Sequence, residues 1–296
     1  MKGSLNVRRY YLDDLTRLLV FPYETQDDRS VLIDAGEYCE RFPKTWEYLL
    51  ACKARLDSPT KKKRGLPWHG FVYKKNHTRF ENPKLLAPAI ATGACFASDP
   101  EGSYYFVGSG AGGGGGYGVL PNEKCPLSFN ALLAVLNSSI ATFFLKLVSA
   151  PFANDYIALT RQFIEDVPIP VASAPQQRML EKLAQWLLFL YRQPSVRVAT
   201  PRHPRDPELA AWFDRWINAL VYELFFPEEL RDKGLNLFSL TQDFAPLPPS
   251  TTADAAITLA SVRGTVDTLS ASGHALRRAL DRLQTLDLVR TIEGGT

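Results

Sequence analysis

The sequence predicts an α+β protein, in which a turn-rich mixed β region with one buried helix precedes a helical C-terminal part. Short apolar runs separated by Gly and Pro fill residues 66–120. Apolar residues at helical spacing dominate residues 128–148 and most of the chain after residue 175. The length of 296 residues, with 46% hydrophobic and 22% charged residues, is typical of a globular chain with one large or two small domains.

The N-terminal part predicts a few short elements. Residues 18–23 are an apolar run that predicts a strand closed by Pro22. Apolar residues at helical spacing predict a helix over 45–56, and Asp57-Ser58-Pro59 ends it. The region 66–120 predicts short strands joined by turns, and its apolar runs lie at 71–73, 85–87 and 104–107.

The second half predicts helices with irregular or proline-rich separators. A helix over Ser128–Val148 has apolar residues on more than one face and is expected in a core. An irregular stretch follows to Pro170, where alternating prolines exclude both helix and central strand. Three further helical regions are predicted at 176–192, 207–226 and 254–290, the last with a break at Ser272-Gly273. We expect four regions, with the bounds 1–56, 57–170, 171–249 and 250–296.

Several classes of protein are excluded by pattern. Four scattered cysteines without a CxxC pair, and four dispersed histidines, argue against a structural zinc site and favour a reducing compartment. The most apolar window, 131–150, contains Asn137, Ser138, Ser139 and Lys146, so it predicts a buried helix and no membrane span. The N-terminus lacks the apolar region of a signal peptide. We therefore expect a cytoplasmic protein without a resident metal.

Positive charge is concentrated in one segment. The net charge is +3, yet residues 53–84 contain ten basic and two acidic residues. Such a stretch favours a polyanionic partner, because lysine and arginine neutralise phosphates. The candidate phosphate contacts are Lys61, Lys62, Lys63, Arg64, Lys74, Lys75 and Arg79, of which the first four are expected in a loop. The alternative is a solvated charge run beside the core aromatics Trp68, Phe71 and Tyr73.

The segment 106–118 has eight glycines within the eleven residues 108–118 and superficially matches GxGxxG. No helix is predicted directly after it, and it lacks the Lys-Ser/Thr of a P-loop. The pattern therefore favours a flexible loop between strands over a nucleotide site. A third reading is a loop whose bare backbone approaches a phosphate chain, with Gly113, Gly115 and Tyr117 as candidates.

Catalytic motifs are missing from the sequence. There is no HExxH and no GxSxG. Asn154-Asp155-Tyr156-Ile157 lacks both prolines of the Asn-Pro-Pro-Tyr type of motif that holds an extruded base in amino-group DNA methyltransferases. We therefore expect no catalytic residue in this chain, and no methyl transfer by the chain alone.

Five motifs in order nevertheless resemble one family. They are Trp46-Glu47-Tyr48-Leu49, Phe80-Glu81-Asn82-Pro83-Lys84-Leu85-Leu86, Cys95-Phe96-Ala97-Ser98-Asp99, Leu132-Leu133-Ala134-Val135-Leu136-Asn137-Ser138 and Phe163-Ile164-Glu165-Asp166-Val167-Pro168-Ile169-Pro170. Together they resemble the C-terminal specificity domain of TaqI-type adenine-N6 DNA methyltransferases. The same domain forms the C-terminal part of type IIG restriction-modification enzymes and related phage-defence methylases. The resemblance spans roughly residues 18–230.

The resemblance implies that the chain is a target recognition module for double-stranded DNA, with its recognition core at 57–170. It places the segment 149–162 at the bases, where the candidate readers are Asn154, Asp155, Thr160, Arg161 and Gln162. The alternative for Arg161 and Asp155 is an internal ion pair. The family's catalytic domain, which would bind S-adenosylmethionine, would lie upstream of Met1. We therefore expect no cofactor in this chain and a methyltransferase domain or subunit as its partner.

Two other functions stay open at this point. The chain could be a protein-interaction subunit that docks through its long amphipathic helices, with an incidental basic segment. It could also retain methyltransferase activity through an unrecognised cofactor site.

Overall fold

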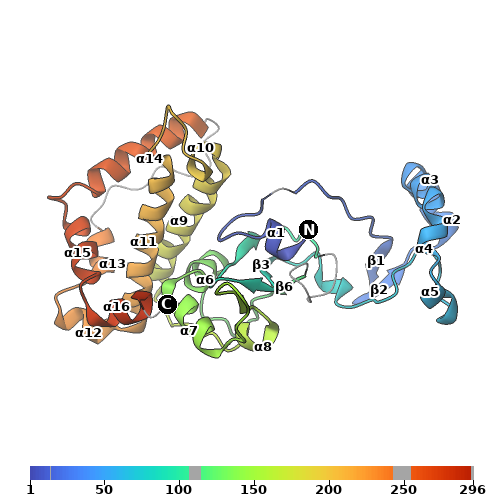
Figure 1. Ribbon diagram of the computed structural model, residues 1–296, viewed down its shortest axis with the longest axis horizontal. Coiled ribbons are helices and arrows are strands. Elements are labelled where there is room, and N and C mark those ends of the chain that lie inside the picture. Colours follow the sequence, from blue (N-terminus) through green and yellow to red (C-terminus); the bar gives the residue numbers. More distant parts are fainter. Residues whose placement is uncertain (14, 107–114, 243–254, 295–296) are drawn as a thin grey trace. The chain divides into compact units, whose positions relative to one another are not determined.

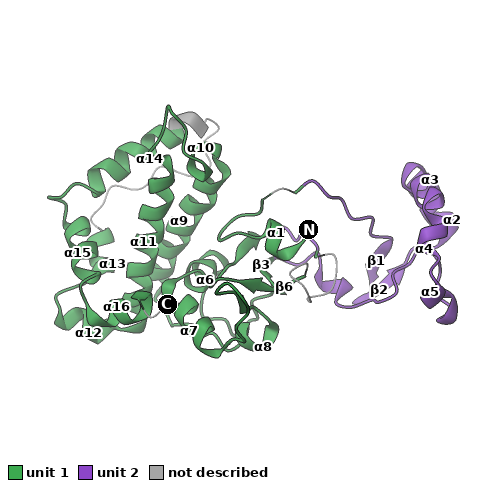
Figure 2. Cartoon of the chain, in the orientation of Figure 1, with its two compact units in different colours: residues 1–15, 84–99, 106–296 green, residues 16–83, 100–105 purple. Residues whose placement is uncertain are grey.

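The structure, a computed structural model, describes all residues except 14, 107–114, 243–254 and 295–296. The chain divides into two compact units (Figure 2). Unit 1 comprises Met1–Leu15, Lys84–Asp99 and Phe106–Thr296, and unit 2 comprises Thr16–Pro83 and Pro100–Tyr105. Unit 2 is thus an insertion into unit 1 in terms of sequence, and each unit is described by itself below.

Unit 2 begins with an antiparallel hairpin of β1 (Tyr23–Gln26) and β2 (Arg29–Leu32). Its turn residues Asp27 and Asp28 both have positive φ, which matches the twist of a two-residue hairpin. The strand predicted at 18–23 is wrong: β1 begins only at Tyr23, and Leu18 is fully exposed. Pro22 has no N–H to extend the ladder towards the N-terminus.

The helices of unit 2 are short. They are α2 (Ala35–Arg41), α3 (Pro43–Ala51), α4 (Lys53–Leu56) and α5 (Pro59–Lys63), followed by the 3₁₀ turn η1 (His77–Arg79). The helix predicted over 45–56 is confirmed as α3 and α4, which meet at Cys52. The strand predicted at 71–73 is wrong, because the Phe71 N–H bonds to the Tyr23 hydroxyl and to no neighbouring strand.

Unit 1 contains a three-stranded antiparallel sheet in the order β5-β3-β6 (Figure 1). Its strands are β3 (Lys84–Pro88), β5 (Ala97–Asp99) and β6 (Gly116–Val119). A separate pair joins β4 (Ile90–Ala91) to β7 (Ile157–Ala158), and a short helix α1 (Gly3–Asn6) begins the chain. The strand predicted at 85–87 is confirmed by β3. Tyr104, Tyr105 and Phe106 form no strand, and Val107 lies outside the described residues.

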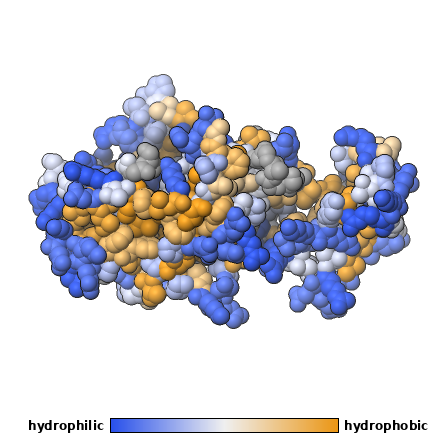
Figure 3. Space-filling model, turned by 60° about the horizontal axis from the view of Figure 1, so that its bottom comes forward, coloured by the Kyte–Doolittle hydropathy of each residue, from blue (hydrophilic) through white to orange (hydrophobic). Residues whose placement is uncertain are grey.

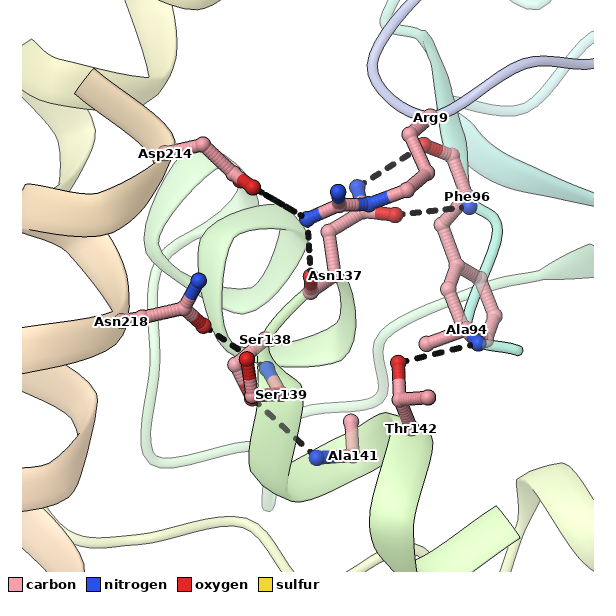
Figure 4. A network of polar contacts seen from close by, with 10 residues as sticks. All are labelled: Arg9, Ala94, Phe96, Asn137, Ser138, Ser139, Ala141, Thr142, Asp214 and Asn218. Atoms are coloured by element: carbon pink, nitrogen blue, oxygen red, sulfur yellow. Dashed lines mark hydrogen bonds and ion pairs between the residues drawn. The ribbon is translucent and has the colours of Figure 1, made fainter. Parts of the chain in front are cut away.

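The buried helix predicted over 128–148 is two helices, α6 (Phe129–Leu136) and α7 (Ser139–Val148). Asn137 interrupts the run because its side chain bonds to the Phe96 backbone, donating to the carbonyl and accepting from the N–H, both at 2.9 Å (Figure 4). Ser138 then caps α7 by accepting from the Ala141 N–H. In the described part of the chain no single helix could cross a membrane. Only the pair α6 and α7 has the necessary length and composition, and it is bent by 60°.

The C-terminal part is helical as predicted. It contains α8 (Arg161–Ile164), α9 (Ala174–Arg192), α10 (Pro194–Arg197), α11 (Asp206–Phe225), α12 (Pro227–Asp232), α13 (Leu237–Gln242), α14 (Ala255–Leu269), α15 (Ala275–Leu283) and α16 (Asp287–Gly294). The region predicted as one helix with a single break, 254–290, is thus three helices, with the predicted break between α14 and α15 and a second one before α16. With small sheets and many helices, the structure confirms the α+β class.

The core of unit 1 lies between the helices and the sheet. In Figure 1, α9 and α11 run side by side, and α6 packs against α9. Trp186 on α9 stacks with Phe213 on α11, and both are buried. On α14, the apolar residues Leu259 and Val262 are buried in the same core. The buried faces of these helices are therefore covered within unit 1. Figure 3 shows a broad band of apolar residues across the left half of the face that it presents, bordered by polar residues.

Candidate nucleic-acid interface

Residues 61–63 belong to the short helix α5, and Arg64 is its C-cap. The loop predicted here is therefore wrong. Ser58 caps α5 and Pro59 opens it. A helix points successive side chains in different directions, and this separates Lys61 from its neighbours. Lys61 is buried, and its ammonium donates to the Trp68 carbonyl at 2.7 Å. Burial lowers the pKa of Lys61. Lys61 is therefore removed from the candidate phosphate contacts.

The other candidate phosphate contacts are exposed on unit 2. Lys62 lies 3.3 Å from a carboxylate oxygen of Asp57. Within the described residues, the remaining five form no ion pair with a carboxylate. They are Lys63, Arg64, Lys74, Lys75 and Arg79. Their positive charges are consequently available to an external anion.

Two of these cations lie on aromatic rings. The Arg64 guanidinium lies 5.1 Å from the centre of the Tyr73 ring and donates to the Val72 carbonyl. The Lys74 ammonium lies 5.3 Å from the centre of the Tyr23 ring. Such contacts hold a cation in place without neutralising its charge. The side chains are thus partly ordered before any ligand arrives.

Most aromatic residues of the basic segment are structural. His77 lies among Phe21, Tyr23, Phe71 and Phe80. Burial lowers the pKa of His77, and its Nδ1 is 3.1 Å from the Ser30 hydroxyl. Trp68 and His69 pack with Trp46 in a second cluster.

Tyr73 differs from these, because it is 73% exposed. Of the aromatic residues in the basic segment, Tyr73 is therefore the best placed to stack on a base.

In unit 1, Asn154 and Asp155 form the tip of a hairpin between Pro151 and Ile157. Both have φ of 58°, the left-handed conformation that Asn and Asp tolerate better than most residues. The Phe152 N–H donates to the Tyr156 carbonyl across the hairpin at 2.6 Å. The turn geometry by itself accounts for these two residue types. Both are exposed, so they are also accessible to a ligand.

The remaining readout candidates lie at the start of α8. Arg161 is 84% exposed and pairs with Glu165 at 2.8 Å, one helical turn on. The internal ion pair with Asp155, the alternative from the sequence, is therefore not formed. Gln162 is exposed, whereas the Thr160 hydroxyl is buried without a hydrogen-bond partner. Arg161 and Gln162 can reach a ligand directly, and Thr160 cannot do so in this conformation.

The glycine run is described only in part. Gly113 lies outside the described residues. Gly115 is buried, and its carbonyl accepts from the Ala89 N–H at 3.1 Å. Tyr117 belongs to β6 and packs against the core. At Gly116, a Cβ atom would collide with the Phe106 ring and the Ala87 carbonyl, so this glycine permits close packing. Gly115 and Tyr117 therefore belong to the region of the sheet. Neither residue lies on an open loop that could approach a phosphate chain.

The structure also shows a cavity in unit 1 that the sequence did not predict, with charged, amide, aromatic and aliphatic residues in its lining. Arg9 is one of the lining residues, and its polar contacts are drawn in Figure 4. One terminal nitrogen of Arg9 donates to the Asn137 carbonyl and to the Asp214 carboxylate, both at 2.7 Å. Asn218 accepts from the Ser139 N–H at 2.7 Å. The spacing of Asp214 and Asn218 is the signal that could have been found, because four residues apart they share one face of α11.

Among the described residues, no group of three or more His, Cys, Asp or Glu residues could hold a metal ion. The four cysteines are unpaired thiols, and burial raises the pKa of the Cys95 thiol to about 11. A thiol with this pKa is protonated at neutral pH and is a poor nucleophile.

No protein-family model matches the chain, and no curated protein matches it either.

Proposed function

We propose that the chain is a recognition module for double-stranded DNA, and that unit 2 makes its phosphate contacts. The observation that supports this most directly is the set of exposed cations on unit 2 that have no carboxylate partner among the described residues: Lys63, Arg64, Lys74, Lys75 and Arg79. Unpaired cations are what a phosphate backbone requires.

Sequence readout is assigned in this proposal to the hairpin tip and the start of α8. Arg161, Gln162 and Asn154 are exposed and have the donors and acceptors that discriminate base edges in the major groove. The resemblance to the specificity domain of adenine-N6 DNA methyltransferases suggests the setting, which is restriction-modification or phage defence in the cytoplasm. The S-adenosylmethionine-dependent chemistry would then belong to a methyltransferase domain or subunit with which this module works.

The alternative function, docking of a protein through the C-terminal helices, has less support from the structure. The amphipathic patterns of α9, α11 and α14 are accounted for by their packing in the core of unit 1. An ion pair between Arg263 and Asp206, with two contacts of 2.7 and 2.8 Å, further holds α14 against α11. These helices do not need an external partner to bury their apolar faces.

The experiment is a salt titration of the full chain with a duplex of random sequence. Affinity should fall steeply between about 50 and 200 mM salt, because each neutralised phosphate releases a counterion. A library of duplexes selected by the chain should then show one preferred site. Weak, salt-independent association with all duplexes would contradict the proposal.

A further inference from the structure

The cavity around Arg9 in unit 1 is not used by the proposed function. Its volume is about 900 Å³, within the range of small-molecule sites. The segment around Arg9, the start of α7, α11 and the C-terminal helices line it. All of these belong to unit 1. The cavity is therefore a feature of one compact unit, and the inference from it does not depend on DNA binding.

The charged groups of the cavity are already bonded within the protein. Arg9 is paired with Asp214, and Arg215 pairs with Asp281 at 2.8 Å. The Glu293 carboxylate, which also lines the cavity, accepts from the Tyr222 hydroxyl at 3.1 Å. The Arg8 guanidinium donates to the backbone carbonyls of Ser4, Leu5 and Val7. A charged ligand would have to compete with these bonds. The lining therefore favours a neutral ligand.

Uncharged hydrogen-bonding groups remain in the cavity wall. The Asn218 side chain uses its oxygen for the Ser139 N–H, and its NH₂ group has no partner among the described residues. The Gln284 amide is likewise unpartnered within the described residues, and it offers one donor group and one acceptor. Two amide side chains in one cavity suit a ligand edge that presents both donors and acceptors.

Part of the cavity wall is aromatic. The rings of Tyr11 and Tyr191 both line the cavity and stack on each other, with centres 4.9 Å apart and planes 18° apart. Aromatic walls favour flat ligands, because a flat ligand can bury a large area against a ring. Alanine and isoleucine side chains at Ala91, Ala211 and Ile292 complete the apolar part of the lining.

Backbone strain lies beside this cavity. Tyr10, between the lining residues Arg9 and Tyr11, has φ of 70°. Its hydroxyl is buried without a hydrogen-bond partner, and so is the Nε atom of Arg9. Non-glycine residues in this conformation are strained and gather at functional sites. Backbone strain and two unpaired polar atoms thus lie next to the cavity wall.

We propose that this cavity binds a neutral nucleobase, with the Asn218 NH₂ group and the Gln284 amide on its polar edge. Adjacent donors and acceptors on a flat, uncharged ring system are the properties of a nucleobase, and asparagine and glutamine are the side chains that read such edges. The base could belong to a free nucleoside or be extruded from DNA. Both sources have the same chemistry, and the experiment distinguishes them.

The first arm measures binding of adenosine, cytidine, guanosine and thymidine to the full chain without DNA, by calorimetry. We expect saturable binding of at least one nucleoside. Asn218→Asp keeps the oxygen that accepts from Ser139 and removes the NH₂ group, and Gln284→Met removes the second amide. Each should weaken binding about tenfold, since one good hydrogen bond is worth about 1.4 kcal/mol in this setting.

Asn236→Asp is the matched control, because this asparagine is exposed and outside the cavity. It should bind nucleosides like the unaltered chain. If Asn218→Asp fails to fold, Gln284→Met decides the question alone. Binding of phosphate or citrate in place of nucleosides, or equal nucleoside binding by all variants, would overturn the proposal.

The second arm uses a duplex that contains 2-aminopurine, whose fluorescence rises when it leaves the base stack. A rise that Gln284→Met abolishes, with DNA affinity retained, assigns the site to an extruded base. Nucleoside binding without any fluorescence change assigns it to a free nucleoside. The absence of both signals overturns the inference and leaves the DNA-binding proposal untouched.

Discussion

Lys84 of unit 1 and three lysine and arginine residues of unit 2 lie in opposite environments. In unit 1, Lys84 on β3 pairs with Asp99 on β5 at 2.7 Å, and their side chains are only 6% and 1% exposed. In unit 2, Lys63, Lys75 and Arg79 are exposed and form no ion pair in the described structure. All four lie in one basic stretch of the sequence. A run of basic residues thus contains both structural cations and cations free for a ligand, and only their burial separates them.

The largest expected effect tests the structural side of this comparison. Lys84→Met removes the cation that pairs with the buried Asp99 carboxylate, which costs about 3–5 kcal/mol of unfolding free energy. Denaturant unfolding of the full chain measures the loss. The double variant Lys84→Met/Asp99→Leu should recover most of it, because two apolar side chains need no partner. Equal loss in both variants would mean that the pair is not what stabilises this site.

The second prediction concerns the pH dependence of unit 2. Because burial lowers the pKa of His77, the unfolded chain takes up a proton more readily than the folded one. The contribution of His77 to the free energy of unfolding is therefore complete above the ordinary histidine pKa of about 6.5. It is lost as the pH falls below that value. Thermal unfolding between pH 7.5 and 5.5 should show this loss, with Asp and Glu groups contributing little. In His77→Gln the drop should shrink, and an unchanged drop would assign it to other groups.

The third prediction sharpens the account of the strained segment in unit 1. Tyr10→Phe removes a buried hydroxyl that has no hydrogen-bond partner. The variant should be more stable by about 1 kcal/mol, since folding no longer has to desolvate that group. Denaturant titration is the measurement. A destabilised variant would show that the hydroxyl is bonded in the folded protein.

The smallest effect on stability is expected at Arg161. Its ion pair with Glu165 is exposed, so Arg161→Ala should leave the melting temperature unchanged. Affinity for single-base variants of the preferred site should change at one position only, by about 1–3 kcal/mol. The control must not disturb the fold. Gln177→Ala is unsuitable for this reason, because Gln177 forms hydrogen bonds with the backbone of Ser128 and Pro126. Lys233→Ala, on an exposed residue away from α8, serves that purpose. Unchanged preference in Arg161→Ala would remove this residue from readout.

Long amphipathic patterns were sufficient to predict α9 and α11, because an apolar period of 3.6 residues that continues over many turns is specific to helices. The division of the 128–148 helix was not predictable from periodicity. It depends on Asn137 bonding to Phe96, which is 41 residues away in the sequence. Similarly, the apolar run at 18–23 has the composition of a strand, but no neighbour pairs with it before Tyr23.

The sequence predicted which basic residues belong to the candidate site, but it did not predict which of them are buried. The exposure of Lys62 and Lys63 and the burial of Lys61 follow from α5, which was predicted as a loop. The cavity around Arg9 was missed entirely, since it is assembled from segments that are more than 100 residues apart. Contacts of this range leave no local pattern, although the Asp214–Asn218 spacing marks one of its walls.

The most direct test of the central claim compares two variants of equal charge change. One carries Lys63→Gln, Lys74→Gln, Lys75→Gln and Arg79→Gln in unit 2. The other carries Lys124→Gln, Arg192→Gln, Lys233→Gln and Arg278→Gln, which neutralise four exposed cations of unit 1. The measurement is the slope of log affinity against log salt on one duplex. The account predicts that the slope falls by about 3 to 4 in the unit 2 variant, at roughly 0.9 per lost phosphate contact, and changes little in the unit 1 variant. Equal slopes in the two variants would contradict the assignment of the phosphate contacts to unit 2.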